Sequence, residues 1–379
     1  MEIDELRKKI DLIDDEMVKL YARRMGLSAE IAKEKVKTGK SVSDRTREKE
    51  IIFRLSNLAP KELTLYLKEL YETVFFTSRA YQSALIGGNS KTVTEIRALI
   101  GNGLENMPTS ATIACQGVKG ANSMTAAQKF FPVSSIVYVK NFEGVFSAVE
   151  SGLCEYGVLP IENSTAGSVL EVYDLMRKHN FRIVNSARIK ISHCLAALPD
   201  VELKDVKTII SHPQALKQCE EFLKTLSATA KPDENTAVSA RRVAESGDKT
   251  LAALCSKECA ESYGLKILKA DVETNSLNYT RFILIKKDLC IYKGADKMSV
   301  MTSLPHESGS LNRLLGRFSA LGLNLTKLES RPIIGADFEF MFYFDFEGDV
   351  TEPAVQNLIA ELENGSENFV FLGAYKEKV

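Results

Sequence analysis

The chain has 379 residues, of which 45% are hydrophobic and 26% charged, and its 49 basic and 50 acidic side chains leave a net charge of −1. This length predicts two or three domains, and this composition is that of a globular protein, which excludes a disordered or collagen-like chain. The near-zero net charge gives no bulk attraction to polyanions. We therefore expect neither nucleic acid nor a membrane as a partner.

The cysteine pattern indicates reduced thiols. The seven cysteines are an odd number, include no CxxC pair and accompany only four histidines. A disulfide framework or a zinc site is therefore not expected, and neither is a cofactor. No stretch approaches about 18 uncharged apolar residues, and the first residues, MEIDELRKKI, are charged and amphipathic. The sequence predicts a cytoplasmic protein.

Residues 1 to about 86 predict an all-helical module, since they contain one proline, Pro60, and two glycines. Apolar residues recur at a spacing of three and four from Ile3 to Ile31. This pattern predicts one helix of about 40 residues with an apolar seam, followed by helices at roughly 44–56 and 61–85. Three helices with so long a first member cannot readily close a core, so we expect interdigitating partners in a homodimer or higher homo-oligomer.

The chain from about 109 to 288 has a different pattern of predicted secondary structure. After the polar stretches GGNSKTVTE and GNGLENMPTS, short β-branched runs alternate with helical segments, from ATIAC to YTRFILI. This alternation predicts parallel sheet with crossover helices, in two α/β lobes whose ligands bind where the strand-to-helix loops converge.

From Met298 onward the pattern is strand, helix, strand, a turn at Ile334-Gly335-Ala336, strand, helix, strand. This string of about 80 residues predicts an α+β, ferredoxin-like βαββαβ fold.

The seam of the first predicted helix carries charges. Arg24 takes the seam position after Leu20, and Lys35 lies three turns further on nearly the same face. A guanidinium buried without a partner costs several kcal/mol, so Arg24 must meet carboxylates or an anion. Each polar residue could be a surface charge with an intrahelical partner, but the set supplies cations and donors to a bundle interior.

The segment LRKKIDLIDDEMVKLYARRMGLSAEIAKEKVKTGKSVSDRTREKEI resembles the AroQ-type chorismate mutase domain that begins bifunctional P-proteins. The resemblance implies eight active-site residues: Arg7, Arg24, Lys35, Asp44, Arg47, Glu48, Ser78 and Gln82. Chorismate rearranges without nucleophile, metal or proton transfer, so positioning and electrostatics must supply the acceleration.

The implied roles follow the charges of chorismate. Arg7, reaching into the partner subunit's site, and Arg24 would clamp the two carboxylates. Lys35 and Gln82 would donate to the ether oxygen, where negative charge develops. Glu48 would accept a hydrogen bond from the substrate hydroxyl. Asp44 and Arg47 would hold Glu48 in place, and Ser78 would help to hold a substrate carboxylate.

Four polar loops stand out in the α/β region: 117–123, 160–169, 211–219 and 278–282. The first three follow apolar runs and open helices, where backbone N–H groups favour an anion. A nucleotide phosphate loop is not expected, because neither GxxxxGK[ST] nor GxGxxG occurs. Helix capping by Asn163, Ser164 and Ser211 is the competing interpretation.

Together ENSTAGSV, SHPQALKQC and NYTRF resemble the signature loops of prephenate dehydratase. The resemblance implies a cleft lined by Ser123, Glu162, Asn163, Ser164, Ser211, Gln218 and Thr280, with Arg281 holding a substrate carboxylate. Asn122 stands where the family usually has Tyr. Thr280 would hydrogen-bond the leaving oxygen, since its hydroxyl is too weak an acid to protonate it, and Glu162, or else His212, would donate the proton.

The segment SGSLNRLLGRFSALGLNLTKLESRP resembles an ACT domain of the phenylalanine-responsive kind, with Ser310 in place of the usual Ala. It implies an allosteric L-phenylalanine site at a dimer interface, formed by Gly309, Ser310, Leu311, Glu329, Ser330, Arg331 and Pro332. Turn chemistry with an exposed ion pair is the alternative.

The predicted domains are a chorismate mutase domain at 1–91, a prephenate dehydratase domain at 109–288 and an ACT regulatory domain at 297–379. The predicted function is a bifunctional enzyme that converts chorismate to prephenate and prephenate to phenylpyruvate, with feedback inhibition by L-phenylalanine. An arogenate dehydratase and a non-catalytic amino-acid sensor are the alternatives.

Overall fold

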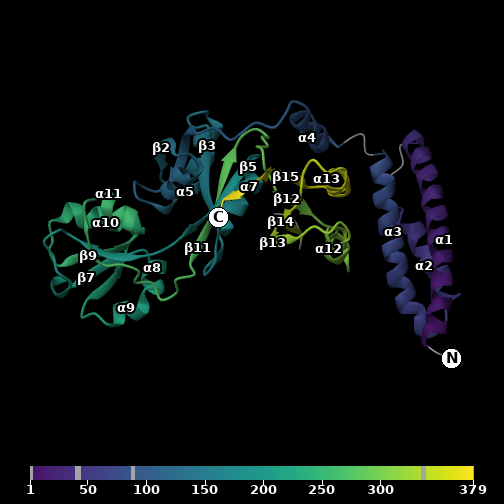
Figure 1. Ribbon diagram of the computed structural model, residues 1–379, viewed down its shortest axis with the longest axis horizontal. Helices are drawn as coiled ribbons and strands as arrows, with labels where there is room; N and C mark the ends of the chain where they lie inside the picture. The colour runs from purple at the N-terminus through teal and green to yellow at the C-terminus, as the bar shows by residue number, and fades with distance from the viewer. Residues whose placement is uncertain (1–2, 39–43, 87–89, 334–338, 379) are drawn as a thin grey trace. The chain divides into compact units, whose positions relative to one another are not determined.

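The computed structural model describes residues 3–38, 44–86, 90–333 and 339–378 (Figure 1). It divides into two compact units, one made of Met1–Asn102 with Ser299–Phe371 and the other of Gly103–Met298 with Leu372–Val379. The predicted turn at 334–336 lies outside the described residues. Within the described ranges, no helix has the length and apolarity needed to cross a membrane.

The predicted helices of the first region are confirmed. They are α1 (Ile3–Thr38), α2 (Arg45–Ser56) and α3 (Thr64–Ile86), the last preceded by a 3₁₀ turn, η1 (Lys61–Leu63). Asp44 sets the start of α2, because its side chain accepts a hydrogen bond from the backbone N–H of Arg47 at 3.1 Å. Both α1 and α2 pack against α3.

The apolar seam of α1 is largely exposed in the single chain. Ile10 is 56% exposed and Leu20 65%, and six more seam residues are also exposed: Ile3, Leu6, Ile13, Met17, Leu27 and Ile31. A contiguous apolar surface of this extent is typical of a face that another chain covers.

One helix was not predicted. α4 (Lys91–Gly101) begins within the polar stretch GGNSKTVTE, to which we assigned no helix. Its N-cap is Ser90, whose hydroxyl accepts from the backbone N–H of Val93 at 3.0 Å, and it buries Val93 and Ile96. The Ser cap three residues before Val93 was the available signal.

The elements from Lys297 to Tyr375 have the predicted order. They are β12 (Lys297–Ser303), α12 (Ser310–Ala320), β13 (Leu325–Pro332), β14 (Phe340–Glu347), α13 (Pro353–Gly365) and β15 (Phe369–Tyr375). The sheet order is β13-β14-β12-β15, which makes β13 an edge strand. Phe318 of α12 packs on Phe344 and Phe346 of β14, with ring centroids 5.7 and 5.0 Å away.

The first lobe of the second unit is a sheet in the order β16-β5-β11-β3-β1-β2, with β4 on β3. Its strands are β1 (Ser110–Gln116), β2 (Val133–Val139), β3 (Tyr156–Asn163), β4 (Gly167–Ser168), β5 (Arg182–Lys190), β11 (Tyr279–Lys286) and β16 (Glu377–Lys378). The prediction of parallel sheet is correct for β1 with β2 and β3, but β11 is antiparallel to β3 and β5. The chain enters β11 from the second lobe, not from a crossover helix, so the rule for βαβ units does not apply to it.

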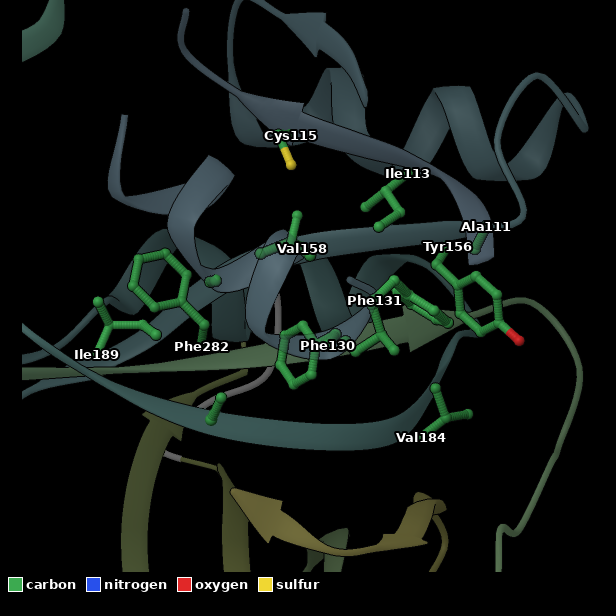
Figure 2. Close-up of a cluster of buried hydrophobic side chains, with 14 of the residues drawn as sticks. Ala111, Ile113, Cys115, Phe130, Phe131, Tyr156, Val158, Val184, Ile189 and Phe282 are labelled. Carbon is green, nitrogen blue, oxygen red and sulfur yellow. The ribbon is translucent and has the colours of Figure 1, made fainter. Parts of the chain in front are cut away.

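Helix α5 (Asn122–Phe130) packs against β1, β3, β5 and β11, while α6 (Phe142–Glu150) and α7 (Leu170–Lys178) pack against β3. Figure 2 shows the core beneath α5, where Phe130 and Phe131 meet Val158, Val184 and Phe282 from three strands. This core fixes β3 and β11 side by side.

The second lobe has the strand order β10-β6-β9-β7-β8. Its elements are β6 (Cys194–Ala197), η2 (Leu203–Asp205), β7 (Thr208–Ser211), α8 (Pro213–Gln218), α9 (Glu220–Lys224), β8 (Thr229–Pro232), α10 (Thr236–Ser246), β9 (Leu251–Cys255), α11 (Lys257–Ser262) and β10 (Lys266–Lys269). Helices α10 and α11 cover one face, and α8 and α9 the other (Figure 1). The segments 191–193 and 270–278 join the lobes, and the backbone N–H of Ile191 donates to the Asn278 carbonyl at 2.8 Å.

Candidate functional sites

A buried polar cluster lies between α1 and α3. Gln82 Nε2 donates to Ser78 Oγ at 3.2 Å, Ser78 Oγ to Ser28 Oγ at 2.9 Å, and Ser28 Oγ to the Arg24 carbonyl at 3.0 Å. Ser28, Ser78 and Gln82 are all buried. The structure therefore brings three of the predicted mutase residues, Arg24, Ser78 and Gln82, to one interior face.

Two polar atoms of this cluster lack a hydrogen-bond partner among the described residues. They are Arg24 Nη1 and Gln82 Oε1, both fully buried. The Arg24 guanidinium instead lies over the ring of Phe75, 5.5 Å from its centroid. Buried polar groups are nearly always satisfied, so these two atoms are available for contacts with a polar ligand.

The other predicted mutase residues lie elsewhere in the single chain. Glu48 forms an ion pair with Arg79 of α3, and Lys35 is half-buried near the end of α1. Asp44 is the N-cap of α2. The two remaining arginines are exposed and pair locally, Arg7 with Asp4 at 3.2 Å and Arg47 with Glu50 at 3.1 Å.

The second site is built by the register of β3 and β11. Asn163 lies opposite Thr280, and Glu162 lies opposite Arg281. Asn163 Nδ2 donates to Thr280 Oγ1 at 2.9 Å and to Asn278 Oδ1 at 2.8 Å. Because the Thr280 oxygen accepts this bond, its own proton stays available to a ligand.

Charged groups follow directly after Thr280. Arg281 Nη2 lies 3.5 Å from Glu162 Oε2, and Arg281 Nη1 lies 3.9 Å from Glu377 Oε2 of β16. Burial raises the pKa of Glu377, but the nearby cations Lys297, Arg188 and Arg281 outweigh this effect, so the pKa lies below its usual value. The Glu162 side chain is 34% exposed and beside a guanidinium. The burial on which its predicted acid role depended is therefore not observed.

The predicted serines bind backbone groups. Ser123 Oγ donates to the Gln116 carbonyl and Ser211 Oγ to the Leu254 carbonyl, both at 2.7 Å. Ser164 Oγ donates to the Leu277 carbonyl at 3.0 Å and accepts from the Tyr279 N–H at 2.9 Å. His212 caps α8, its Nδ1 accepting from the Gln214 N–H at 3.2 Å. Of these side chains, Ser164 is the one whose bonds hold the backbone next to Thr280.

A contact between the lobes of the second unit completes this site. Gln218 Oε1 lies 3.0 Å from His193 Nε2, and Gln218 Nε2 donates to Thr165 Oγ1 at 3.3 Å. Sequence reasoning missed His193, Thr165 and Glu377. Thr165 directly follows the ENS motif, which was a signal, whereas the contact of Glu377 with Arg281 depends on the pairing of β16 with β5.

In the C-terminal module, Gly309 is the N-cap of α12 with φ 81°, a left-handed conformation that favours glycine. Ser310 Oγ accepts from Arg313 Nη2 at 3.1 Å, and Arg313 also pairs with Glu307 at 2.8 Å. The other predicted segment, Glu329–Pro332, ends the edge strand β13, where Glu329 lies opposite Tyr343. Neither this module nor any other described part of the chain holds a group of three or more His, Cys, Asp or Glu arranged for a metal ion.

Comparison with known proteins assigns two parts of the chain to enzyme families. The prephenate dehydratase family matches residues 113–289, and the chorismate mutase type II family matches residues 6–83. Arogenate dehydratase 2 of Petunia hybrida is 37% identical over 299 residues, which are 74% of this chain and 76% of that protein. The bifunctional chorismate mutase/prephenate dehydratase of Escherichia coli (strain K12) is 29% identical over 381 residues, 98% of this chain and 95% of that one.

A solved structure agrees with these matches. The prephenate dehydratase of Arthrobacter aurescens in complex with L-Phe has a TM-score of 0.64 and 31% identity, over 70% of this chain and 89% of that chain. The class so defined is an enzyme with a mutase domain ahead of a dehydratase domain. The chain belongs to the prephenate dehydratase family, in the bifunctional form that also carries a chorismate mutase. Both enzyme activities belong to phenylalanine biosynthesis, and the alternative of a non-catalytic sensor is wrong.

Proposed function

We propose that chorismate rearranges to prephenate at the cluster between α1 and α3, and that prephenate is dehydrated beside Thr280. The mutase assignment is supported by the buried Arg24 Nη1, which has no hydrogen-bond partner among the described residues. The observation that carries the dehydratase assignment is the bond from Asn163 Nδ2 to Thr280 Oγ1, because it uses the threonine oxygen as an acceptor and leaves its proton available to a ligand. The leaving oxygen of prephenate gains negative charge as its C–O bond breaks, and a fixed O–H donor stabilises that charge.

Arg281 would hold the substrate carboxylate that is retained, and the other carboxylate leaves as CO2. Glu162, already 3.5 Å from Arg281, would either protonate the departing hydroxyl or hold Arg281 in place. When chorismate is supplied to the full chain, prephenate should rise first and phenylpyruvate should follow. Phenylpyruvate formation from prephenate but not from chorismate would contradict the mutase site.

We also propose that the enzyme is a homodimer or higher homo-oligomer. The exposed seam of α1 supports this, because a second long helix would cover it and would bring Arg7 of the partner near the Arg24 cluster. A monomeric mass by light scattering at assay concentration would rule out this arrangement.

We infer that the C-terminal module, 297–379, is an ACT domain with the ferredoxin-like fold and binds L-phenylalanine. Its strand order supports the fold, and the complex of the Arthrobacter aurescens enzyme with L-Phe supports the ligand. The N–H groups at Gly309–Leu311 would bind the amino-acid carboxylate, and the edge strand β13 would pair with a second module. To inhibit, L-phenylalanine must bind the less active state more tightly.

Removing the carboxylate of Glu329 should weaken L-phenylalanine binding by about tenfold, since a charge-assisted bond to the ligand ammonium would be lost. The check is calorimetric titration of L-phenylalanine into wild type and Glu329→Ala, with Glu352→Ala at the exposed start of α13 as the matched control. Absence of heat with the wild type, or unchanged affinity in Glu329→Ala, would disprove the site.

Arogenate, the aminated analogue of prephenate, is a second candidate substrate, because the plant relatives are named arogenate dehydratases. The two substrates differ by an ammonium in place of a keto oxygen. Comparison of kcat/KM for prephenate and arogenate with the same preparation decides between them.

A further inference from the structure

The two dehydratase lobes are joined by the side-chain amide of Gln218, which has a defined orientation. Gln218 is the last residue of α8 in the second lobe, and Thr165 follows β3 in the first. The amide of Gln218 joins them, with Oε1 toward His193 and Nε2 toward Thr165. An amide has an acceptor at one end and donors at the other, so its orientation decides which of them faces the site.

His193 determines this orientation. Its side chain is buried at 5% exposure, and its Nδ1 has no hydrogen-bond partner among the described residues. A proton on Nδ1 would be an unsatisfied buried donor, so the single proton of the neutral ring belongs on Nε2. From there it is donated to Gln218 Oε1, which turns the Gln218 NH₂ toward Thr165.

The neutral state of the ring has a physical cause. Burial lowers the pKa of His193, and this effect outweighs the Gln218 bond and the nearby Glu273 carboxylate, which act in the opposite direction. Glu273 is engaged with the backbone, accepting from the His193 N–H at 2.9 Å. Burial thus favours the neutral ring, whose one proton is donated to Gln218.

The direction of donation continues to Thr280. Thr165 Oγ1 donates to Asn163 Oδ1 at 2.7 Å, and Asn163 Nδ2 donates to Thr280 Oγ1. The backbone N–H groups of Thr165 and Ala166 also donate to Asn163 Oδ1, at 3.0 and 2.9 Å, so the Asn163 amide is fixed independently. Gln218 is the member of this series whose orientation depends on His193.

We infer that His193 is a positioning residue for the dehydration, holding Gln218 with its N–H groups toward the substrate and Thr165. A reversed amide would present its carbonyl oxygen to a dianionic substrate and to a Thr165 hydroxyl whose proton is already donated to Asn163. Both contacts would be repulsive. The inference rests on the proposed roles of Thr280 and Gln218.

The test uses the full-length chain and replaces the ring by groups of similar reach. His193→Phe keeps a ring but has no donor, and should lower kcat/KM for prephenate by about ten- to a hundredfold through misplacement of Gln218. His193→Gln places an amide N–H near the position of Nε2 and should restore most of this loss. Mutase activity, measured on the same sample, should be unchanged and reports the folded enzyme concentration.

A double-mutant cycle separates positioning from a merely structural role. If His193 acts through Gln218, adding His193→Phe to Gln218→Leu should cause no further loss, whereas independent effects would multiply. Multiplying effects, failure of His193→Gln to restore activity, or full activity of His193→Phe would each overturn the inference. Full activity of Thr280→Ala would instead overturn the proposed site itself, so the two failures are distinguishable.

Discussion

Thr280→Ala should lower kcat for prephenate by about two to three orders of magnitude, the loss seen when one donor to a developing oxyanion is removed. The reason is local, since the Thr280 oxygen accepts from Asn163 and its own proton stays available for donation to the ligand. The fold should tolerate the change, because Asn163 Nδ2 keeps Asn278 Oδ1 at 2.8 Å and the Tyr279 carbonyl at 3.2 Å as acceptors. The measurement is steady-state conversion of prephenate to phenylpyruvate.

The control for this prediction is Thr280→Ser, which retains the hydroxyl and should retain most of the activity. The mutase rate of both variants should equal that of the wild type, because α1–α3 and β11 belong to different units. A Thr280→Ala enzyme that dehydrates prephenate at the wild-type rate would contradict the assignment.

Much of the fold could be predicted because its elements carry their own signals. The seam of α1 and the strand–helix order from β12 to β15 follow from hydrophobic periodicity. β8 and β10 are short, and β10 is half polar, so periodicity does not identify them. The antiparallel placement of β11 depends on the chain returning from the second lobe, which local sequence does not report.

The sites were predictable to the extent that their residues lie in motifs. The family resemblance implied that Asn163 and Thr280 line one cleft, but their positions opposite each other in strand register could not be predicted from the motifs. His193 lies outside those motifs, and a buried histidine reads from sequence as an ordinary core residue. Glu377 reaches Arg281 only through the pairing of β16 with β5. Contacts of this kind are set by tertiary structure.

The most informative mutase variant is Arg24→Met, which should abolish most activity without loss of stability. Removing a partly buried cation that binds a substrate carboxylate should lower kcat/KM for chorismate by about three orders of magnitude. Stability should stay equal or rise, since Arg24 Nη1 is buried with no partner among the described residues and methionine fills similar space without desolvation cost. Thermal unfolding and mutase turnover on one preparation measure both effects.

The neighbouring Arg23 offers the matched control, because it is exposed on the same helix turn and Arg23→Met should change neither quantity. Arg24→Lys keeps the charge but not the bidentate geometry, and should fall between the wild type and Arg24→Met. Dehydratase activity should be normal in all three variants. Wild-type mutase turnover in Arg24→Met would show that the Arg24 guanidinium does not bind substrate. A marked fall in the unfolding temperature of Arg24→Met would show that partners within the fold hold Arg24. The lack of a hydrogen-bond partner for Arg24 Nη1 would then no longer support a ligand site.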